Sequence, residues 1–505
     1  MKKVVDEPLV ESLFLIFILF VSFFLFFFNL GNQYLWQDEA QTALISKTIL
    51  TYGIPHGYDG QNSFSQELGR DYTKNYVWIW HPWLPFYVIA AFFKLFGVNT
   101  FVSRLPAALF GIGTVFLTWY FCKALWQSRT IAFTAAFLLL VSVPFLLLSR
   151  QCRYYSIAAF FSLLGLYAYV RILDGKKYRA YAVFVLSAAS LFNTQYSCCI
   201  ALLSTVILHT LFFRRQKFRE VLLLAVVSVL INVPWIIWLL SAGRGQINVQ
   251  EFLKSGLFVP LIKTYIERIG RYIFPFYLFL VVLLVSICSR IRNGYFISRD
   301  RLFWERLLLL LLFIFINLVI LGVISSYPFF RYLTPLIPIF VIITALLVIS
   351  AARVHPAAAA AILALLIFTS PLKDFLYEIT HDYDGPVEGI VKYLNKNGSR
   401  NDVVVITYDD MPLKFYTQMR VLGGFTGEDL SPAKKAKWII LRKHLICLKD
   451  KKVREYLVQN LQGEDYEEVT IDYPDIPTEN REDPAYHYYR TVVDEKKVTI
   501  LKRIR

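Results

Sequence analysis

Cysteine is scarce in this 505-residue chain, and acidic residues are scarce in its first 371 positions. The six cysteines show neither CxxC spacing nor a regular ladder, which excludes a disulfide framework and a CxxC metal or redox site. Residues 1–371 carry 31 Lys and Arg against 14 Asp and Glu, whereas residues 372–505 carry 22 against 23. The net charge of +16 therefore belongs to the first part, where it falls in short loops between apolar runs. This placement is typical of positive-inside topology and argues against nucleic-acid binding.

The apolar runs of the first part predict an integral membrane protein. Hydrophobic residues make up 56% of the chain, and several runs approach the length that spans ~30 Å of hydrocarbon. Spanning segments must be helical because backbone groups in lipid have to satisfy one another. No small-residue cleavage site follows the first run, so we expect it to remain as an anchor. We predict about eleven crossings, at residues 12–30, 104–125, 131–148, 155–171, 179–192, 195–212, 218–240, 272–289, 304–324, 329–351 and 355–371.

The basic loops set the predicted orientation. The segments 122–129, 171–179, 214–219 and 289–301, together with Arg353, should face the cytoplasm. A further run at 81–97 would invert all of these loops if it crossed, so we predict an interfacial helix there. The N-terminus is then cytoplasmic and the large first loop, 31–103, lies outside the cell membrane.

Composition changes after Pro371. The stretch "NDVVVITYDDMPLKFYT" is typical of a strand followed by a helix, and "KWIILRKHLICL" is a second strand candidate. We therefore predict two domains: a transmembrane domain at 1–371 and an extracytoplasmic α/β domain at 372–505.

Charged residues on the predicted outer side are candidates for a functional site. Asp38 and Glu39 follow the first crossing. Cations also lie in outer turns where the topology rule disfavours them, at Arg150, Arg153 and Arg331 beside Tyr154, Tyr155 and Tyr332. Guanidinium groups give paired hydrogen bonds to phosphate oxygens, so this set suits a lipid-linked phosphate. The simpler interpretations are a solvated acidic pair, arginines that reach the lipid headgroups, and a helix start at His81 and Pro82.

In chain order, five sequence elements carry a family resemblance: "WQDEAQTA", "HPWLP", "SRLPAALFGIGTV", "SRQCRYYS" and "RYLTPLIP". Together they resemble the GT-C glycosyltransferases that use polyprenyl-phosphate sugars, notably bacterial protein O-mannosyltransferases and aminoarabinose lipid A transferases. The resemblance covers about residues 30–371. It departs from the pattern at Trp83, where a second proline is usual, and at Trp80, where some relatives have an acidic residue.

The resemblance implies a GT-C fold and a catalytic role for Asp38 as general base. It implies that Glu39 supports Asp38 or binds a divalent metal ion, the candidate cofactor. His81 and the turn residues Arg150, Arg153, Tyr154, Tyr155, Arg331 and Tyr332 would bind the donor. The expected reaction is inverting transfer of a sugar from a polyprenyl phosphate to a hydroxyl of a lipid, glycan or protein, at the outer side of the plasma membrane.

Three other functions are weighed against this one. A transporter or flippase for lipid-linked sugars should carry ionisable residues near mid-membrane, where the runs have almost none beyond His209 near one end. A receptor would not need so many crossings. An O-antigen polymerase or ligase would place its large outer loop late in the chain, whereas here it comes first.

Overall fold

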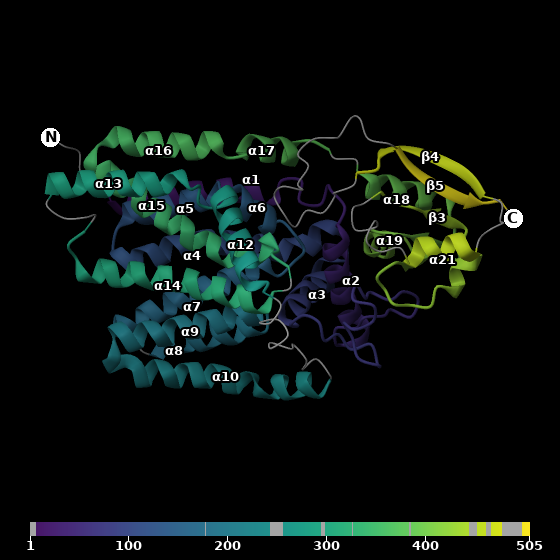
Figure 1. Cartoon of the computed structure of the whole chain (residues 1–505), viewed down its shortest axis with the longest axis horizontal. Helices are drawn as coiled ribbons and strands as arrows, with labels where there is room; N and C mark the ends of the chain where they lie inside the picture. Colours follow the sequence, from purple (N-terminus) through teal and green to yellow (C-terminus); the bar gives the residue numbers. More distant parts are fainter. Residues whose placement is uncertain are drawn as a thin grey trace.

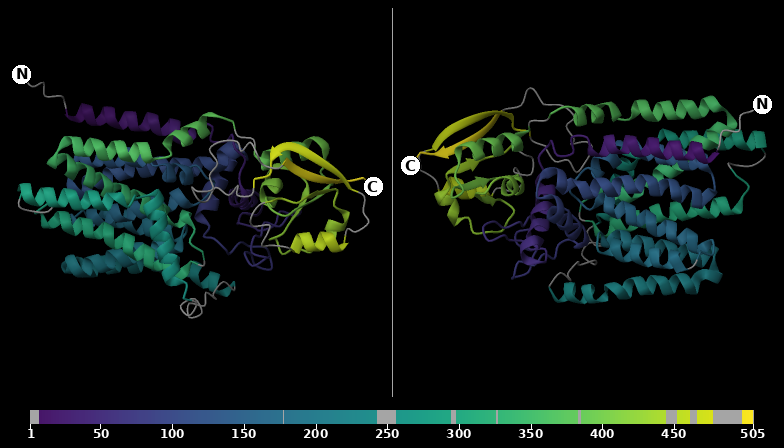
Figure 2. Two further views of the ribbon diagram at one scale, coloured as in Figure 1. Left: turned by 45° about the horizontal axis from the view of Figure 1, so that its top comes forward. Right: turned by 180° about the vertical axis from the view of Figure 1, so that it is seen from behind.

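The computed structural model describes residues 7–176, 178–242, 256–293, 298–325, 327–382, 385–443, 452–460, 466–476 and 497–504. A long bundle of helices carries a smaller domain with a β-sheet at one end (Figure 1). Helices α2 (Gln37–Tyr52) and α3 (Leu84–Phe96) lie between the bundle and the sheet domain, as Figures 1 and 2 both show. The remaining helices before the sheet domain are α1 (Glu7–Phe27), α4 (Thr100–Trp126), α5 (Arg129–Leu140), α6 (Val143–Ser149), α7 (Tyr155–Leu173), α8 (Tyr178–Phe192), α9 (Tyr196–Phe213), α10 (Phe218–Ser241), α12 (Phe258–Tyr272), α13 (Tyr277–Asn293), α14 (Arg301–Ile324), α15 (Ile337–Val354), α16 (Pro356–Thr369) and α17 (Leu372–Thr380).

The apolar runs predict eleven crossings, and in the described part of the chain fewer helices than that qualify as candidate spans by length and composition. Among the described residues, six helices are long and apolar enough to cross, and the count rises to nine if each of three bent pairs is one span. The runs at 12–30 and 179–192 form shorter apolar helices, in α1 and α8. The run at 81–97 forms α3, whose 13 residues rise only about 20 Å. An apolar run therefore predicts a helix here, but it does not fix whether that helix is long enough to span.

Prolines account for the bent pairs. The pairs α5 with α6, α12 with α13, and α16 with α17 bend by 62°, 73° and 46°. Pro144, Pro275 and Pro371 lie at or beside the three breaks. Proline removes a backbone donor and clashes with the preceding turn, so a helix cannot continue straight through it.

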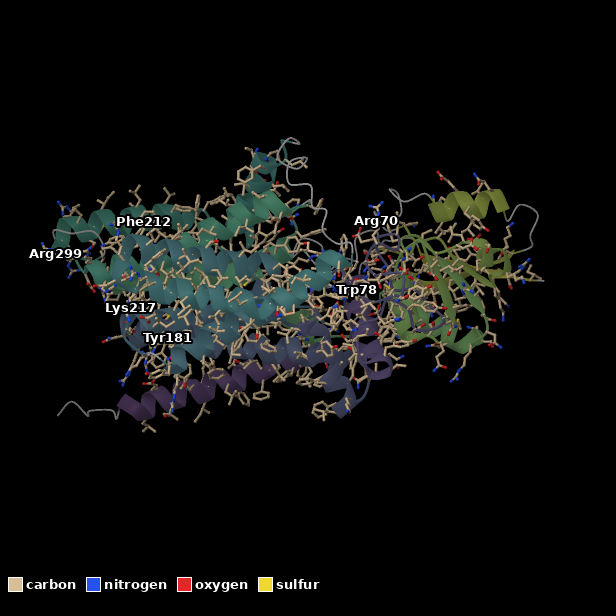
Figure 3. All side chains as sticks on the ribbon, turned by 90° about the horizontal axis from the view of Figure 1, so that it is seen from below. Arg70, Trp78, Tyr181, Phe212, Lys217 and Arg299 are labelled. Atoms are coloured by element: carbon tan, nitrogen blue, oxygen red, sulfur yellow. The ribbon has the colours of Figure 1, made fainter. Side chains whose placement is uncertain are left out.

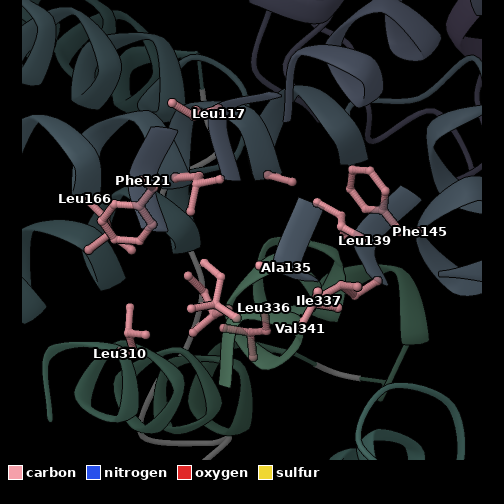
Figure 4. Close-up of a cluster of buried hydrophobic side chains, with 14 of the residues drawn as sticks. Leu117, Phe121, Ala135, Leu139, Phe145, Leu166, Leu310, Leu336, Ile337 and Val341 are labelled. Atoms are coloured by element: carbon pink, nitrogen blue, oxygen red, sulfur yellow. The ribbon is translucent and has the colours of Figure 1, made fainter. Parts of the chain in front are cut away.

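The bundle core is formed by apolar side chains from α4, α5, α6, α7, α14 and α15, among them Phe121, Leu139 and Ile337 (Figure 4). Small residues allow the close approach of neighbouring helices. A Cβ at Gly111 of α4 would lie 2.5 Å from a ring carbon of Phe26 in α1. At Gly165 of α7 it would lie 2.5 Å from a methyl carbon of Leu202 in α9.

Basic loops gather at the end of the bundle away from the sheet domain. Figure 3 shows Lys217 and Arg299 at this far end, whereas Arg70 and Trp78 of the first loop lie near the sheet domain. Two of the loops predicted to share one side of the membrane are therefore at the same end, as the positive-inside pattern requires.

Within its described residues, the C-terminal sheet has five strands in the order β2-β1-β3-β5-β4. Strand β1 pairs in parallel with β2 and β3, and β5 pairs antiparallel with β3 and β4. Val404 and Ile406 face α18 and α19, whereas Val405 faces α21 and η3, so helices cover both faces. The predicted strand and helix of "VVVITYDDMPLKFY" are confirmed as β1 and α19. The elements are β1 (Val403–Ile406), β2 (Arg420–Gly423), β3 (Trp438–Ile440), β4 (Tyr466–Pro474), β5 (Lys497–Arg503), α18 (Pro386–Asn397), α19 (Asp410–Tyr416), η3 (Ser431–Lys435) and α21 (Lys452–Asn460).

Candidate active site

The acidic pair lies in the first turn of α2. Trp36 is extended and caps the helix, and its backbone N–H donates to Glu39 Oε2 at 3.4 Å. Carboxylates are stabilised at this position by the positive end of the helix dipole. Successive residues of a helix are rotated by about 100°, so Asp38 and Glu39 cannot face the same neighbours.

Glu39 is enclosed in the protein. Its side chain is fully buried and forms a two-pronged ion pair with Arg104 of α4, from Nε to Oε1 at 2.8 Å and from Nη2 to Oε2 at 2.7 Å. The backbone N–H of Cys152 also donates to Oε1, at 2.6 Å. Arg104 in turn donates to the carbonyls of Leu30, Gln33 and Tyr34. This geometry favours a role for Glu39 in joining α2, α4 and the turn before α7.

Asp38 lies beside two guanidinium groups instead. Its Oδ2 accepts a hydrogen bond from Arg331 Nη1 at 2.9 Å and lies 3.8 Å from Arg153 Nη2. Its Oδ1 accepts from Gln66 Nε2 at 3.3 Å. The Asp38 side chain is 18% exposed, so it is neither sealed in the core nor free in solvent. Residues about 115 and 293 positions away in sequence thus meet at one carboxylate.

Both arginines are held by their own surroundings. Arg153, in the turn before α7, donates through Nη1 to the Asp38 carbonyl at 3.0 Å and to Thr42 Oγ1 at 2.6 Å. Burial opposes its charge, but the nearby Tyr155 and Asp38 raise the pKa of Arg153 overall. Arg331 belongs to the 3₁₀ helix η2 (Phe330–Leu336), and its guanidinium stacks 4.0 Å from the Phe329 ring. Each guanidinium is therefore fixed in place and remains charged.

Aromatic rings surround this charged cluster. Tyr154 stands edge-on to Tyr155 at 4.9 Å and lies 6.1 Å from His81, between ring centres. His81 is nearly parallel to the buried Trp78 at 6.1 Å. The Tyr332 ring lies 5.8 Å from the Arg331 guanidinium. Burial raises the pKa of Tyr154 well above its usual value, so its hydroxyl stays protonated.

Arg150 has a different environment from the other two arginines. It donates to the carbonyls of Leu25 and Phe28 at the C-terminal end of α1, at 3.0 and 2.9 Å. These carbonyls lack helical partners, and a cation is stabilised by the negative end of the helix dipole. Burial lowers the pKa of Arg150 to about 10, so it remains charged near neutral pH. The Arg150 guanidinium also lies 5.9 Å from the centre of the Phe375 ring in α17, so its described contacts join α1 and α17, whereas those of Arg153 and Arg331 converge on Asp38.

The loop at 65–71 supplies a neighbour of Asp38 that no motif indicated. Buried Asp71 accepts hydrogen bonds from the Ser65 hydroxyl and from the Gln66 backbone, the latter at 2.9 Å. Burial raises the pKa of Asp71, and it also raises the pKa of Glu67, which feels the charges of Asp71 and Asp38. This turn directs the Gln66 side chain to Asp38. Glutamine carries no charge pattern, so sequence alone offered no signal for it.

A divalent metal site at Glu39 does not fit the side chains around it. Both oxygens of Glu39 are engaged by Arg104 and backbone donors. Within the part of the chain that the structure describes, no group of three or more His, Cys, Asp and Glu side chains could hold a metal ion.

Comparison with known proteins adds independent findings. Residues 80–238 match the model of the dolichyl-phosphate-mannose-protein mannosyltransferase family. Among curated proteins, none matches this sequence. The chain shares its fold with ArnT from Cupriavidus metallidurans in the apo state, with a TM-score of 0.60, 14% identity, and coverage of 97% of this chain and 98% of that one. The same enzyme bound to undecaprenyl phosphate gives a TM-score of 0.56, 13% identity, and coverage of 96% and 97%.

A mycobacterial arabinofuranosyltransferase, AftD, is similar over 86% of this chain and 36% of its own, with a TM-score of 0.50 and 13% identity. The fold thus extends across nearly the whole length of this chain and of ArnT, including the sheet domain. Residues 80–238 thus match a mannosyltransferase family, and the chain as a whole has the fold of ArnT.

Proposed function

We propose that this protein transfers a sugar from a polyprenyl-phosphate donor to an acceptor hydroxyl, with inversion at the anomeric carbon, and that Asp38 is the general base. The observation that carries the proposal is the position of Asp38 against Arg331 and Arg153. A carboxylate held by cations at the edge of a partly buried cluster can accept a proton, and the same cations can bind a phosphate.

The reaction follows from these groups. The acceptor oxygen forms a bond to the anomeric carbon while the bond from that carbon to the phosphate oxygen breaks. The acceptor proton passes to the Asp38 carboxylate, and the polyprenyl phosphate leaves with the bonding electron pair. Arg153 and Arg331 stabilise the charge that develops on the leaving phosphate, an effect that is strong where water is excluded.

The free enzyme pairs Arg331 with Asp38, and donor binding changes that pairing. A phosphate beside these residues competes with Asp38 for the guanidinium groups. As Arg331 turns to the phosphate, Asp38 becomes available to accept the proton. Tyr332, His81 and Tyr154 give flat apolar and polar surface to the sugar and to the first part of the lipid.

The similar ArnT structure is bound to undecaprenyl phosphate. We propose that a lipid phosphate of the same kind carries the donor sugar for this protein. The acceptor is a hydroxyl of a lipid, glycan or protein on the outer side of the plasma membrane.

The test is turnover by purified protein in detergent, with radiolabelled mannosyl and aminoarabinosyl polyprenyl phosphates and a panel of hydroxyl acceptors. The wild type should consume a donor and release polyprenyl phosphate, and Asp38→Asn should lose nearly all of that activity while keeping its melting temperature. Asp59→Asn is a matched control, since Asp59 is an exposed carboxylate of the same loop. Full turnover by Asp38→Asn would remove the proposed base. A transporter would bind the donor and leave it intact.

A further inference from the structure

We propose that the C-terminal domain is part of the catalytic apparatus, because it bonds three of the four residues that precede Asp38. The domain's side chains Glu388, Tyr416 and Asp410 act as positioning residues, and residues 34–37 are the segment they fix. This inference rests on the proposed function of Asp38, and it gives the sheet domain a role other than that of a passive cover.

The domain supplies one hydrogen-bond acceptor to each of three positions before Asp38. The bonds run from Tyr34 N to Glu388 Oε1 at 2.8 Å, from Leu35 N to Tyr416 Oη at 2.9 Å, and from Gln37 Nε2 to Asp410 Oδ1 at 2.7 Å. The fourth position, Trp36, is satisfied within α2 by Glu39. Tyr34 and Leu35 precede α2, so their backbone N–H groups have no helical partner and are satisfied by the domain.

Two hydrogen bonds join Gln37 to α19. Beside the bond to Asp410, the backbone N–H of Met411 donates to Gln37 Oε1 at 3.3 Å. Asp410 is also paired with Lys414 at 2.7 Å, and Lys414 donates to the Ser63 carbonyl of the first loop at 2.7 Å. The side chains of Lys414 and Asp410 are 0% and 2% exposed. The domain is thereby joined to α2 and to the first loop at the same place.

The arrangement is more specific than apolar packing. Removing two charges from water is costly, and a buried pair is retained where a single geometry matters. Gly423 in β2 lies against Asp410, and a Cβ there would be 2.4 Å from its Cγ. Tyr416 stacks on Tyr34 with ring centres 4.1 Å apart, and its hydroxyl also lies 2.8 Å from Thr100 Oγ1.

Loss of these hydrogen bonds would displace the Asp38 carboxylate. Gln37 is its neighbour in sequence, so a shift of Gln37 moves the carboxylate relative to Arg331. A misplacement of about 1 Å in a catalytic group can cost roughly 100-fold in rate. We therefore expect loss of these bonds to lower kcat more than it raises KM for the donor.

The experiment compares Tyr416→Phe with Tyr393→Phe. The first change deletes one hydroxyl and keeps the ring, whereas Tyr393 has its ring packed on Trp438 in the same domain, away from α2. Tyr416→Phe should lower kcat about 10-fold with KM close to wild type, because the Leu35 N–H loses its acceptor and the segment before Asp38 is no longer held in one position. Tyr393→Phe should leave both kinetic constants unchanged.

Gln37 gives a second, independent variant. Gln37→Glu places its carboxylate against that of Asp410 and should lower kcat, whereas the Asp410–Lys414 ion pair is left in place. A Gln37→Glu enzyme or a Tyr416→Phe enzyme with full kcat would overturn the proposal.

Hydrogen exchange separates this inference from the proposed function. The amides of residues 34–37 should exchange faster in Tyr416→Phe than in wild type and equally in Tyr393→Phe, whether or not a donor is turned over. An inactive wild type with this difference would refute the proposed reaction alone. Unchanged exchange in Tyr416→Phe would refute the positioning by the domain alone.

Discussion

Asp38 and Glu39 are adjacent in sequence, yet Asp38 pairs with Arg331 of η2 while Glu39 pairs with Arg104 of α4. One carboxylate is partly exposed and borders a cluster of cations and aromatic rings. The other is fully buried, and its ion pair links α2 to α4. The acidic pair therefore divides into a candidate base and a structural anchor.

Glu39→Gln should destabilise the protein strongly. The change leaves the Arg104 charge buried without its partner, which costs about 3–5 kcal/mol. Thermal unfolding in detergent should show a large fall in melting temperature. The double variant Glu39→Gln with Arg104→Met should recover much of it, because no unpaired charge remains. A stable Glu39→Gln protein that lacks turnover would instead mark Glu39 as catalytic.

Arg331→Ala should weaken donor binding. Hydrogen bonds to charged groups contribute about 1.5–3 kcal/mol, so KM for the lipid-phosphate donor should rise roughly 10- to 100-fold. Arg331→Lys should fall between alanine and wild type, because lysine keeps the charge but loses the planar fork. Arg271→Ala, at an exposed arginine of α12, is the matched control. Equal KM values for Arg331→Ala and Arg271→Ala would count against a phosphate site at Arg331.

Arg150→Gln should act on stability and spare the donor. The arginine bonds two carbonyls at the end of α1, and loss of these charge-assisted bonds should cost about 1–3 kcal/mol. We expect a lower melting temperature with an unchanged donor KM. A raised KM at unchanged stability would return Arg150 to the donor site.

Asp409→Asn should change how stability depends on pH. Asp409, Asp410 and Asp475 share a buried cluster with two cations, Arg442 and Lys414, so one carboxylate is in excess. Burial raises the pKa of Asp409 to about 6. Between the unfolded pKa of about 4 and this value, the folded state binds more protons, so this group makes stability fall as pH rises through that window.

The Asp409→Asn variant has no carboxylate to titrate at position 409. Asparagine tolerates the left-handed backbone conformation of this position, where φ is 69°. The variant's melting temperature relative to wild type should therefore be more favourable at pH 7.5 than at pH 4.5. Asp429→Asn is the control. Hydrogen bonds from Ser431 lower the pKa of that exposed carboxylate, so its folded and unfolded titrations both lie below the tested range and its difference from wild type should be nearly the same at pH 4.5 and pH 7.5. A constant offset for Asp409→Asn across this range would contradict the prediction.

Membrane orientation can be tested with two exposed positions at opposite ends of the bundle. In a background without native cysteines, Lys74→Cys in the first loop should react with an impermeant maleimide in intact cells. Arg215→Cys, in the basic loop after α9, should react only after the membrane is opened. The reverse pattern would place the proposed site on the cytoplasmic side.

Much of the fold could be predicted from local sequence. Apolar runs become helices because lipid and core leave the backbone no other partner, and the continuous apolar run "VVVI" gives a strand with two buried faces. The span count was less predictable, because α1 and α8 are short apolar helices in the described residues, and Pro144, Pro275 and Pro371 divide apolar sequence into bent pairs.

The sequence by itself determined which residue types were unusual: two acids after the first run, and arginines in turns where cations are disfavoured. Only the tertiary structure decided their partners, because Asp38 meets Arg331 across 293 positions, and Tyr34 meets Glu388 across 354. Asp38 and Glu39 are adjacent in sequence, and Arg150 and Arg153 are three positions apart. For residues this close in sequence, the packing of distant helices fixes the orientation of the backbone and so decides which side chain reaches the site.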